Sequence, residues 1–299
     1  MVRVDLSVDI GGTKTLVAAF DEDSLVPREV LQFPTEPHRG FEDFLRRLTE
    51  TGKKLLSGEQ LRIWAISTAG AVDDDGNVLW SPNLGWKNLA LKQAFSRFFG
   101  DKGFVENDCN AAAYAEAWVR GSKNLAYVTV STGIGMGLVL EGKVYRGSHY
   151  AAGEIGHTIV EEEGPVCSCG RKGCLQAISS GRGLENLIQS LTGERLRCED
   201  IFEKAKMRFE PYFQVVSHGA KVLARFLTNI VDTLDIEVLV LGGGLTKSEF
   251  YRNMLVEHVQ RNYYMTPGKK ISVELSQVQP NPGTVGVLLL SRQRFGGIV

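Results

Sequence analysis

The sequence predicts an α/β fold with two related halves, and three features of the chain support this prediction. Strand-like apolar segments alternate with helix-like segments, which is typical of the α/β class. Residues 4–10 and 16–20 are apolar runs joined by a glycine turn, the pattern of a β-hairpin. The same order of strand, glycine turn and strand returns at residues 128–140, and such self-similarity indicates an internal repeat.

Elements of the first half are expected where the apolar pattern has the period of a strand or of a helix. The clearest helix covers residues 41–56, with apolar side chains on one face and Gly58 after its end. Residues 35–40 and 79–86 are expected to be loops. The other elements expected here are strands at 29–33, 61–66 and 104–105, a turn at 73–76 and a helix at 89–99.

The second half is expected to open with an alanine-rich helix that ends at Arg120 and has Asn107 or Asp108 as its N-cap. Residues 212–234 predict a long amphipathic helix, whereas residues 148–181 are expected to be irregular. The other elements expected here are strands at 142–145, 236–241 and 271–275 and helices at 183–191, 200–209, 250–264 and 284–292.

Length and composition predict a globular protein of two domains. The chain has 299 residues, of which 43% are hydrophobic and 23% are charged. We expect an N-terminal domain of residues 1–110, completed by a C-terminal helix at 283–299, and a second domain of residues 111–282. The net charge of -1 without a basic block argues against a nucleic-acid surface, and no apolar run predicts a membrane span. The absence of a signal peptide at the start predicts a cytoplasmic protein.

The first glycine turn, Asp9-Ile-Gly-Gly-Thr-Lys14, predicts an anion site. Its glycines leave backbone N–H groups bare, while Thr13 and Lys14 add a hydroxyl and a cation, so polyphosphate is the expected ligand. The spacing excludes a Walker A loop and a dinucleotide fingerprint, because both of those open a helix. An ordinary glycine hairpin turn is the alternative.

The second glycine turn, Ser131-Thr-Gly-Ile-Gly-Met-Gly137, repeats this chemistry. Ser131 and Thr132 offer hydroxyls, and the glycines let the backbone approach a ligand closely. A third glycine turn, Gly242-Gly-Gly244, follows an apolar strand and is expected to lead into a helix. The two similar hairpins predict two halves that grip one nucleotide between them.

Four side chains within residues 153–176 have the spacing of a zinc site. Cys167, Cys169 and Cys174 form a Cys-x-Cys-x4-Cys pattern, and His157 precedes them. Structural zinc takes four such ligands in a closed tetrahedron. Because this stretch has no apparent core of its own, we expect structural Zn²⁺ to order it. The alternative is a loop of reactive or incidental thiols.

Together the motifs resemble those of the ROK family of sugar kinases and repressors, within the actin-like hexokinase superfamily. The resemblance covers nearly the whole chain and also includes Glu106-Asn-Asp-Cys-Asn110 and Gly153-Glu-Ile-Gly-His157. It implies two actin-like, ribonuclease H-like domains that flank a cleft for a nucleotide and a sugar, and it implies a homodimer. The repressors carry an additional N-terminal DNA-binding domain, so a chain that starts at the hairpin is expected to be a kinase.

The resemblance implies a role for each matching residue. Asp108 would be the catalytic base that takes the proton from the sugar 6-hydroxyl. Asp9 would assist Mg²⁺, and Gly243 would lie near the nucleoside of ATP. The phosphates would be held by Gly11, Gly12, Thr13, Lys14, Thr132 and Gly133. The sugar would be bound by Gly70, Asn83, Asn107, Asp108, Glu154, His157 and Gln176, with His157 also a zinc ligand.

Two positions depart from the family pattern. Ala69-Gly-Ala71 stands in place of Pro-Gly-Pro, which loosens that loop. Gln176 stands where the family has a Glu that reaches the sugar near C1 and C2. A neutral amide forms weaker hydrogen bonds with hydroxyls than a carboxylate does. We therefore expect altered sugar affinity or anomeric preference, with transfer to the 6-hydroxyl retained.

The expected function is ATP-dependent phosphorylation of the 6-hydroxyl of glucose or a related hexose. Within the same class, N-acetylglucosamine or N-acetylmannosamine is the alternative substrate. In another class, a catalytically silent sugar-binding regulator is the alternative, although the retention of Asp9 and Asp108 argues against it.

Overall fold

The computed structural model describes residues 3–263 and 271–296, and this part of the chain contains two five-stranded sheets of the same topology. The first sheet has the order β3-β2-β1-β4-β8 and the second the order β11-β10-β9-β12-β13. Each sheet contains an antiparallel hairpin, β1–β2 or β9–β10. The first strand of each hairpin, β1 or β9, pairs in parallel with the strand on its other side, β4 or β12. The predicted α/β class and the predicted internal repeat are therefore confirmed.

The strands of both sheets fall where apolar runs predicted them. The first sheet consists of β1 (Arg3–Ile10), β2 (Lys14–Asp21), β3 (Pro27–Pro34), β4 (Gln60–Thr68) and β8 (Gly103–Asn107). The second sheet consists of β9 (Leu125–Val130), β10 (Ile134–Leu140), β11 (Lys143–Val144), β12 (Val238–Gly242) and β13 (Ser272–Leu275).

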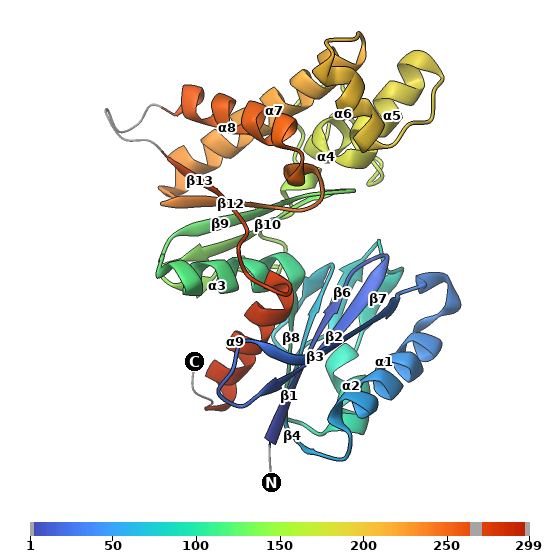
Figure 1. Cartoon of the computed structure of the whole chain (residues 1–299), viewed down its shortest axis with the longest axis vertical. Helices are drawn as coiled ribbons and strands as arrows, with labels where there is room; N and C mark the ends of the chain where they lie inside the picture. The colour runs from blue at the N-terminus through green and yellow to red at the C-terminus, as the bar shows by residue number, and fades with distance from the viewer. Residues whose placement is uncertain (1–2, 264–270, 297–299) are drawn as a thin grey trace.

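Helices cover both faces of the first sheet (Figure 1). On one face α1 (Phe41–Leu56) and α2 (Leu91–Phe99) bury a core that includes Phe44, Leu48 and Phe95. On the other face lies α9 (Pro282–Phe295), which contacts β1, β4 and β8. The C-terminal helix therefore completes the layer structure of the N-terminal sheet.

The second sheet is also covered on both faces (Figure 1). One face packs against α3 (Asp108–Arg120), whose alanines let the helix approach the strands closely. The other face holds the largest core of the described residues. The helices on that face are α4 (Leu175–Ser179), α5 (Gly181–Thr192), α6 (Cys198–Lys206), α7 (Tyr212–Leu234) and α8 (Glu249–Asn262).

Helices α3 and α9 join the two halves. They pack closely, because a Cβ added to Gly286 of α9 would lie 1.7 Å from the Ala111 carbonyl oxygen of α3. The first residue of α3 is Asp108, so this helix carries the predicted catalytic base to the point where the two sheets meet. The division into residues 1–110 with 283–299 and 111–282 stays a prediction.

Four predictions of local structure were wrong. Residues 35–40 are not loop throughout, because they contain a 3₁₀ turn, η1 (Pro37–Arg39). Residues 79–86 are not a loop, because β6 (Val78–Ser81) pairs with both β5 (Ala71–Val72) and β7 (Trp86–Leu89) in a small third sheet. The stretch 148–181 is not irregular throughout, since it contains α4 and a short 3₁₀ turn, η2 (Ile155–His157). The third glycine turn leads first into another 3₁₀ turn, η3 (Leu245–Lys247), and only then into α8.

Two predicted segments extend beyond the described residues. The helix expected at 250–264 is α8, and its last expected residue, Tyr264, lies outside the described part; so do residues 297–299 of the expected C-terminal helix. Within the described ranges, no helix combines the length and the apolar character that crossing a membrane requires.

Candidate active site

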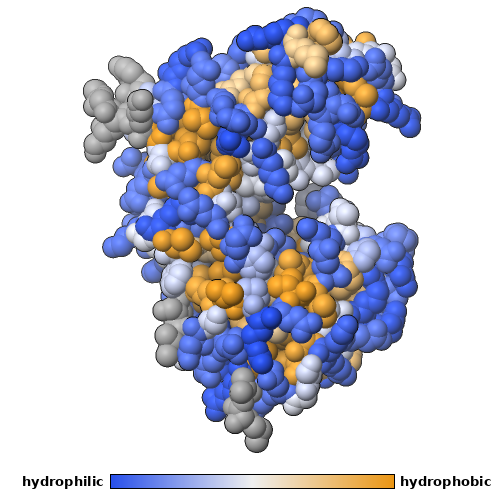
Figure 2. Space-filling view, in the orientation of Figure 1, coloured by the Kyte–Doolittle hydropathy of each residue, from blue (hydrophilic) through white to orange (hydrophobic). Residues whose placement is uncertain are grey.

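A cleft of about 830 Å³ lies where the two sheets meet, and most of the predicted site residues line it. Figure 2 shows the surface hollowed between the upper and lower parts of the molecule. This volume lies in the range of small-molecule sites in proteins. The predicted residues that line it are Gly11, Gly12, Thr13, Lys14, Gly70, Asn83, Asn107, Asp108, Thr132, Gly133, Glu154, His157 and Gln176.

The first glycine turn is held in shape by hydrogen bonds of its own backbone and of Thr35. The Gly11 N–H donates to the Lys14 carbonyl oxygen at 3.0 Å. The Thr35 hydroxyl donates to the Gly11 carbonyl oxygen at 2.7 Å, and the Thr35 N–H donates to the Thr13 carbonyl oxygen at 3.0 Å. These bonds turn the carbonyl groups inward, so the tip can present N–H groups and the Lys14 ammonium to an anion.

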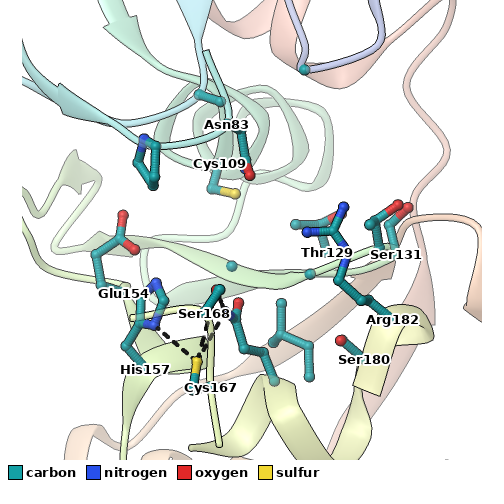
Figure 3. Close-up of a pocket in the computed structure, with 18 of the residues that line it drawn as sticks. Asn83, Cys109, Thr129, Ser131, Glu154, His157, Cys167, Ser168, Ser180 and Arg182 are labelled. Carbon is teal, nitrogen blue, oxygen red and sulfur yellow. Dashed lines mark hydrogen bonds between the residues drawn. The ribbon is translucent and has the colours of Figure 1, made fainter. Parts of the chain in front are cut away.

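The second glycine turn is held by the start of α5. The Gly181 N–H donates to the Ser131 carbonyl oxygen at 2.8 Å, and the Arg182 N–H donates to the Thr132 carbonyl oxygen at 3.3 Å. Figure 3 shows the Arg182 side chain beside Thr129 and Ser131 at this end of the cleft. This turn therefore gains a cation from a different element of the fold.

Arg182 was not among the predicted site residues. Its guanidinium forms no hydrogen bond or ion pair with the residues that the structure describes, although its side chain lines the cleft. One signal was available in the sequence, because a cation in the first turn of a helix opposes the helix dipole and has no stabilising role there. An unpaired arginine in a cleft suits a phosphate group, whose oxygens match its donors.

Asp108 enters the cleft at the first turn of α3. Asn107 caps this helix, since its side-chain oxygen accepts from the Asn110 N–H at 3.0 Å. Asp108 Oδ1 accepts from the Cys109 N–H at 2.8 Å, whereas Oδ2 accepts no hydrogen bond from the described residues. Burial raises the pKa of Asp108, and the nearby charge of Glu154 raises it further. A carboxylate with one free oxygen and a raised pKa can accept a proton from a hydroxyl.

Glu154 and His157 lie on the opposite wall, in and next to the 3₁₀ turn η2. In Figure 3 both side chains point into the opening below Asn83. Desolvation by the walls of the cleft raises the pKa of Glu154, and the neighbouring His157 lowers it in part. The Asn107 amide donates to the Gly70 carbonyl oxygen at 3.0 Å, which fixes its orientation beside Asp108. Several carboxylate and amide groups thus converge, as binding of a polyhydroxyl ligand requires.

His157 and the three cysteines form one cluster, with their ligand atoms all within 4.8 Å of one another. Cys167 Sγ lies 3.7 Å from His157 Nδ1, and Cys169 Sγ lies 3.7 Å from Cys174 Sγ. Sulfur ligands at about 2.3 Å from a tetrahedral zinc are separated by about 3.8 Å, so these spacings fit Zn²⁺. Hydrogen bonds from Arg171 lower the pKa of Cys169 to about 6, which favours its thiolate, whereas burial raises the pKa of Cys174 and favours its thiol form.

The Gln176 side chain lines the cleft and also contacts this cluster. Its amide nitrogen donates to Ser168 Oγ at 3.2 Å and to Cys167 Sγ at 3.3 Å. A carboxylate at this position could not donate to a thiolate and would be repelled by it. The unusual amide therefore has a structural partner in addition to any contact with a sugar.

Asp9 and Gly243 do not line the cleft. Asp9 lies behind the first turn, where its oxygens accept from Ser67 Oγ at 2.6 Å and from the Asn281 amide at 3.1 Å. Burial raises the pKa of Asp9 to about 6. Gly243 has a φ of 91°, and a Cβ there would lie 2.4 Å from the Val130 carbonyl oxygen, so close packing alone requires glycine. Their predicted contacts with Mg²⁺ and the nucleoside stay predictions.

Comparison with known proteins identifies the family of this chain. The family model described as "ROK family" matches residues 5–294. The chain belongs to the ROK family. Among its relatives, the glucokinase of Thermotoga maritima is 28% identical, with 98% of each chain covered. The N-acetylmannosamine kinase of Citrobacter koseri is 32% identical, with 96% of this chain and 98% of the relative covered.

Solved structures of ROK proteins have the same fold. The ROK hexokinase of Thermus thermophilus superposes with a TM-score of 0.85 at 28% identity, over 98% of this chain and 99% of that one. The ROK glucokinase of Streptomyces griseus, solved with glucose and AMPPNP, gives a TM-score of 0.82 at 25% identity, over 97% and 99%. The ROK match confirms the predicted family and its actin-like architecture.

Proposed function

We propose that this ROK protein is an ATP-dependent sugar kinase that phosphorylates the 6-hydroxyl of glucose or a related hexose. The single observation that supports this most is that both glycine turns and Asp108 line one cleft. Phosphoryl transfer requires mainly that donor and acceptor be held in line and that developing charge be stabilised. Two anion-binding tips and one carboxylate in the same cleft meet that requirement.

Different residues of the cleft would bind the two substrates. The backbone N–H groups of both tips, with Lys14 and Arg182, would bind the phosphates of ATP. Asn107 and Glu154 would bind sugar hydroxyls, and Asp108 would accept the proton of the attacking hydroxyl as it reacts. Bound Mg²⁺ would neutralise phosphate charge, and Asp9, behind the first tip, is the residue proposed to assist it. Zn²⁺ would fix the orientation of His157, whose other ring nitrogen would face the sugar.

An N-acetylhexosamine is a second candidate substrate, favoured by two observations. The relatives include an N-acetylmannosamine kinase that is 32% identical to this chain. In addition, the cleft has an apolar rim: Trp80 is 47% exposed and Val166 69% exposed, and the Trp80 ring lies 6.5 Å from the ring of His157. Exposed apolar side chains beside a residue proposed to bind the sugar suit an acetyl methyl group.

The test is ADP release with glucose, N-acetylglucosamine and N-acetylmannosamine, for the wild type and for Asp108→Asn. Loss of the base is expected to lower kcat by about 10²- to 10⁴-fold while sugar binding persists. Asp101→Asn, at an exposed carboxylate outside the cleft, is the control and should keep the wild-type rate. An Asp108→Asn protein with full activity would falsify the assignment. Sugar binding by a wild type that releases no ADP would favour a silent sugar-binding regulator.

A further inference from the structure

Directly before Asn107 and Asp108, the chain holds a buried carboxylate that does not line the cleft. The side chain of Glu106 is 1% exposed. Its Oε1 accepts from the Asn107 N–H at 2.9 Å and from the Asn110 amide at 3.1 Å. Its Oε2 accepts from Arg146, through Nε at 2.8 Å and through a second guanidinium nitrogen. A buried carboxylate is tolerated only with such partners, and Arg146 is the one that supplies a positive charge.

The two partners belong to different halves of the molecule. Glu106 is the last residue but one of β8, in the first sheet, and lies two residues before the start of α3. Arg146 follows β11, in the second sheet, on the segment that leads to Glu154. That segment is folded back on itself, because the Ala152 N–H donates to the Arg146 carbonyl oxygen at 3.1 Å. The pair therefore ties the start of α3 to the loop that carries Glu154.

We propose that Arg146 and Glu106 are positioning residues for phosphoryl transfer, which rests on the proposed kinase function. Glu106 contacts the backbone of Asn107 and the side chain of Asn110, so it holds the first turn of α3 from two sides. Arg146 fixes Glu106 relative to the loop of Glu154 by a charge-assisted pair of hydrogen bonds. The pair thereby sets the separation between Asp108, the base, and Glu154, the residue proposed to bind the sugar.

The test compares Arg146→Met with Arg120→Met, a matched variant at the other end of α3. Arg120 also binds a buried carboxylate, Glu116, whose side chain is 0% exposed, but that pair lies away from the cleft. Arg146→Met is expected to lower kcat by about 10- to 100-fold, because a small misplacement of reacting groups is costly. The KM for ATP should change by less than about twofold, since neither Arg146 nor Glu106 lines the cleft.

Two further variants separate positioning from general stability. Arg146→Lys keeps the charge and should restore kcat to within about fivefold of the wild type, whereas Glu106→Gln, which weakens the charge-assisted bonds, should lower it. Arg120→Met should lower the thermal midpoint and leave kcat within about twofold of the wild type. If Arg146→Met does not fold, Arg146→Lys takes its place: kcat below wild type with an unchanged KM for ATP supports the proposal.

Three outcomes would overturn the proposed positioning role of Arg146 and Glu106. An Arg146→Met protein that folds and keeps the wild-type kcat would remove the positioning role; if Arg146→Met does not fold, Arg146→Lys and Glu106→Gln proteins that both keep the wild-type kcat would do the same. An Arg120→Met protein that loses as much kcat as Arg146→Met would show that any loosening of α3 has the same effect. A wild type that releases no ADP with any hexose would reject the proposed function first and the positioning role with it, so the two failures are distinguishable.

Discussion

The two glycine turns of the cleft have similar backbones but obtain their positive charge in different ways. The turn between β1 and β2 carries Lys14 within its own motif. The turn between β9 and β10 contains only hydroxyls and glycines, and its cation, Arg182, comes from the start of α5. If the turns bind phosphate as proposed, the first has its cation in its own local sequence, whereas the second obtains one only when the chain folds.

The two turns also differ in their support. Thr35, which directly follows β3 in the same sheet, holds the first turn. The second turn precedes β10, whose Met136 N–H donates to the Gly153 carbonyl oxygen at 3.0 Å, and Gly153 begins the segment that leads to the His157 and cysteine cluster. If the metal orders that segment, loss of the metal should affect the second hairpin and spare the first.

Metal removal should therefore give the largest effect and should separate the two hairpins. Structural zinc supplies on the order of 10 kcal/mol in zinc-finger peptides, so a strong chelator should lower the unfolding free energy by several kcal/mol. Hydrogen exchange should show lost protection in β10 with little change in β1 and β2. Elemental analysis should give one zinc per chain for the wild type and for Cys198→Ser, a thiol outside the cluster. Exchange that rises equally in both hairpins would contradict the comparison.

The residues that precede the turns differ in charge, and this predicts an effect of pH. Asp9 is the last residue but one of β1, two residues before Gly11, and Thr129 is the last but one of β9, two residues before Ser131. Burial raises the pKa of Asp9 from 3.8 to about 6, so the protonated form suits the fold better. The wild type should then lose stability as the pH rises from about 4 to about 6, because the folded state binds more protons than the unfolded state in this window.

Asn at this position does not titrate, so the Asp9→Asn protein should not lose stability in this way as the pH rises. Its unfolding free energy relative to the wild type should therefore increase between pH 4 and pH 7 by up to about 3 kcal/mol, since each pKa unit corresponds to about 1.4 kcal/mol. Urea unfolding at both pH values measures the difference. Thr129→Val, at the equivalent position, is the control and should show no such change with pH. If the difference in unfolding free energy between Asp9→Asn and the wild type is the same at both pH values, burial does not disfavour the charged form of Asp9.

The sequence predicted best those parts of the fold whose pattern is local and long. The bounds of α1 and α7 coincide with the predicted 41–56 and 212–234, because many apolar residues repeat at helical spacing. The small third sheet was missed, since β6 and β7 have four residues each and alternate too briefly to show a period. Helix α4, with five residues, is likewise too short for a pattern to emerge.

In the candidate site, too, the residues that belong to local motifs were predicted, and those that depend on distant contacts were not. Motifs such as those of Lys14 and Asp108 combine backbone and side-chain chemistry within a few residues, and the structure brings them into one cleft. Arg182, Trp80 and the bond between Glu106 and Arg146 depend on which loops meet after folding. The sequence near these residues does not indicate which loop each of them will contact.

Neutralising the two cations tests whether the turns bind separate phosphates. Lys14→Met and Arg182→Met should each raise the KM for ATP about tenfold, equivalent to about 1.4 kcal/mol, which is typical of one hydrogen bond to a charged group. If the cations bind different phosphates, the two effects should add in the double variant. Lys143→Met, at an exposed lysine outside the cleft, should leave the KM unchanged. An unaffected KM for ATP in Arg182→Met would leave the second turn without a cation and would break the comparison.

The smallest effect is expected at Gln176, which lies next to Gly133 of the second turn. In Gln176→Glu the side chain can no longer donate to Cys167 and Ser168, and the thiolate repels it toward the cleft. There a carboxylate forms stronger hydrogen bonds with sugar hydroxyls than the amide does, so the sugar KM should fall by about twofold to fivefold with kcat nearly constant. Gln176→Met, which can form neither bond, should raise the sugar KM. If both variants keep the wild-type KM for glucose and for N-acetylmannosamine, Gln176 serves the metal loop alone, and the second turn takes no part in sugar binding through it.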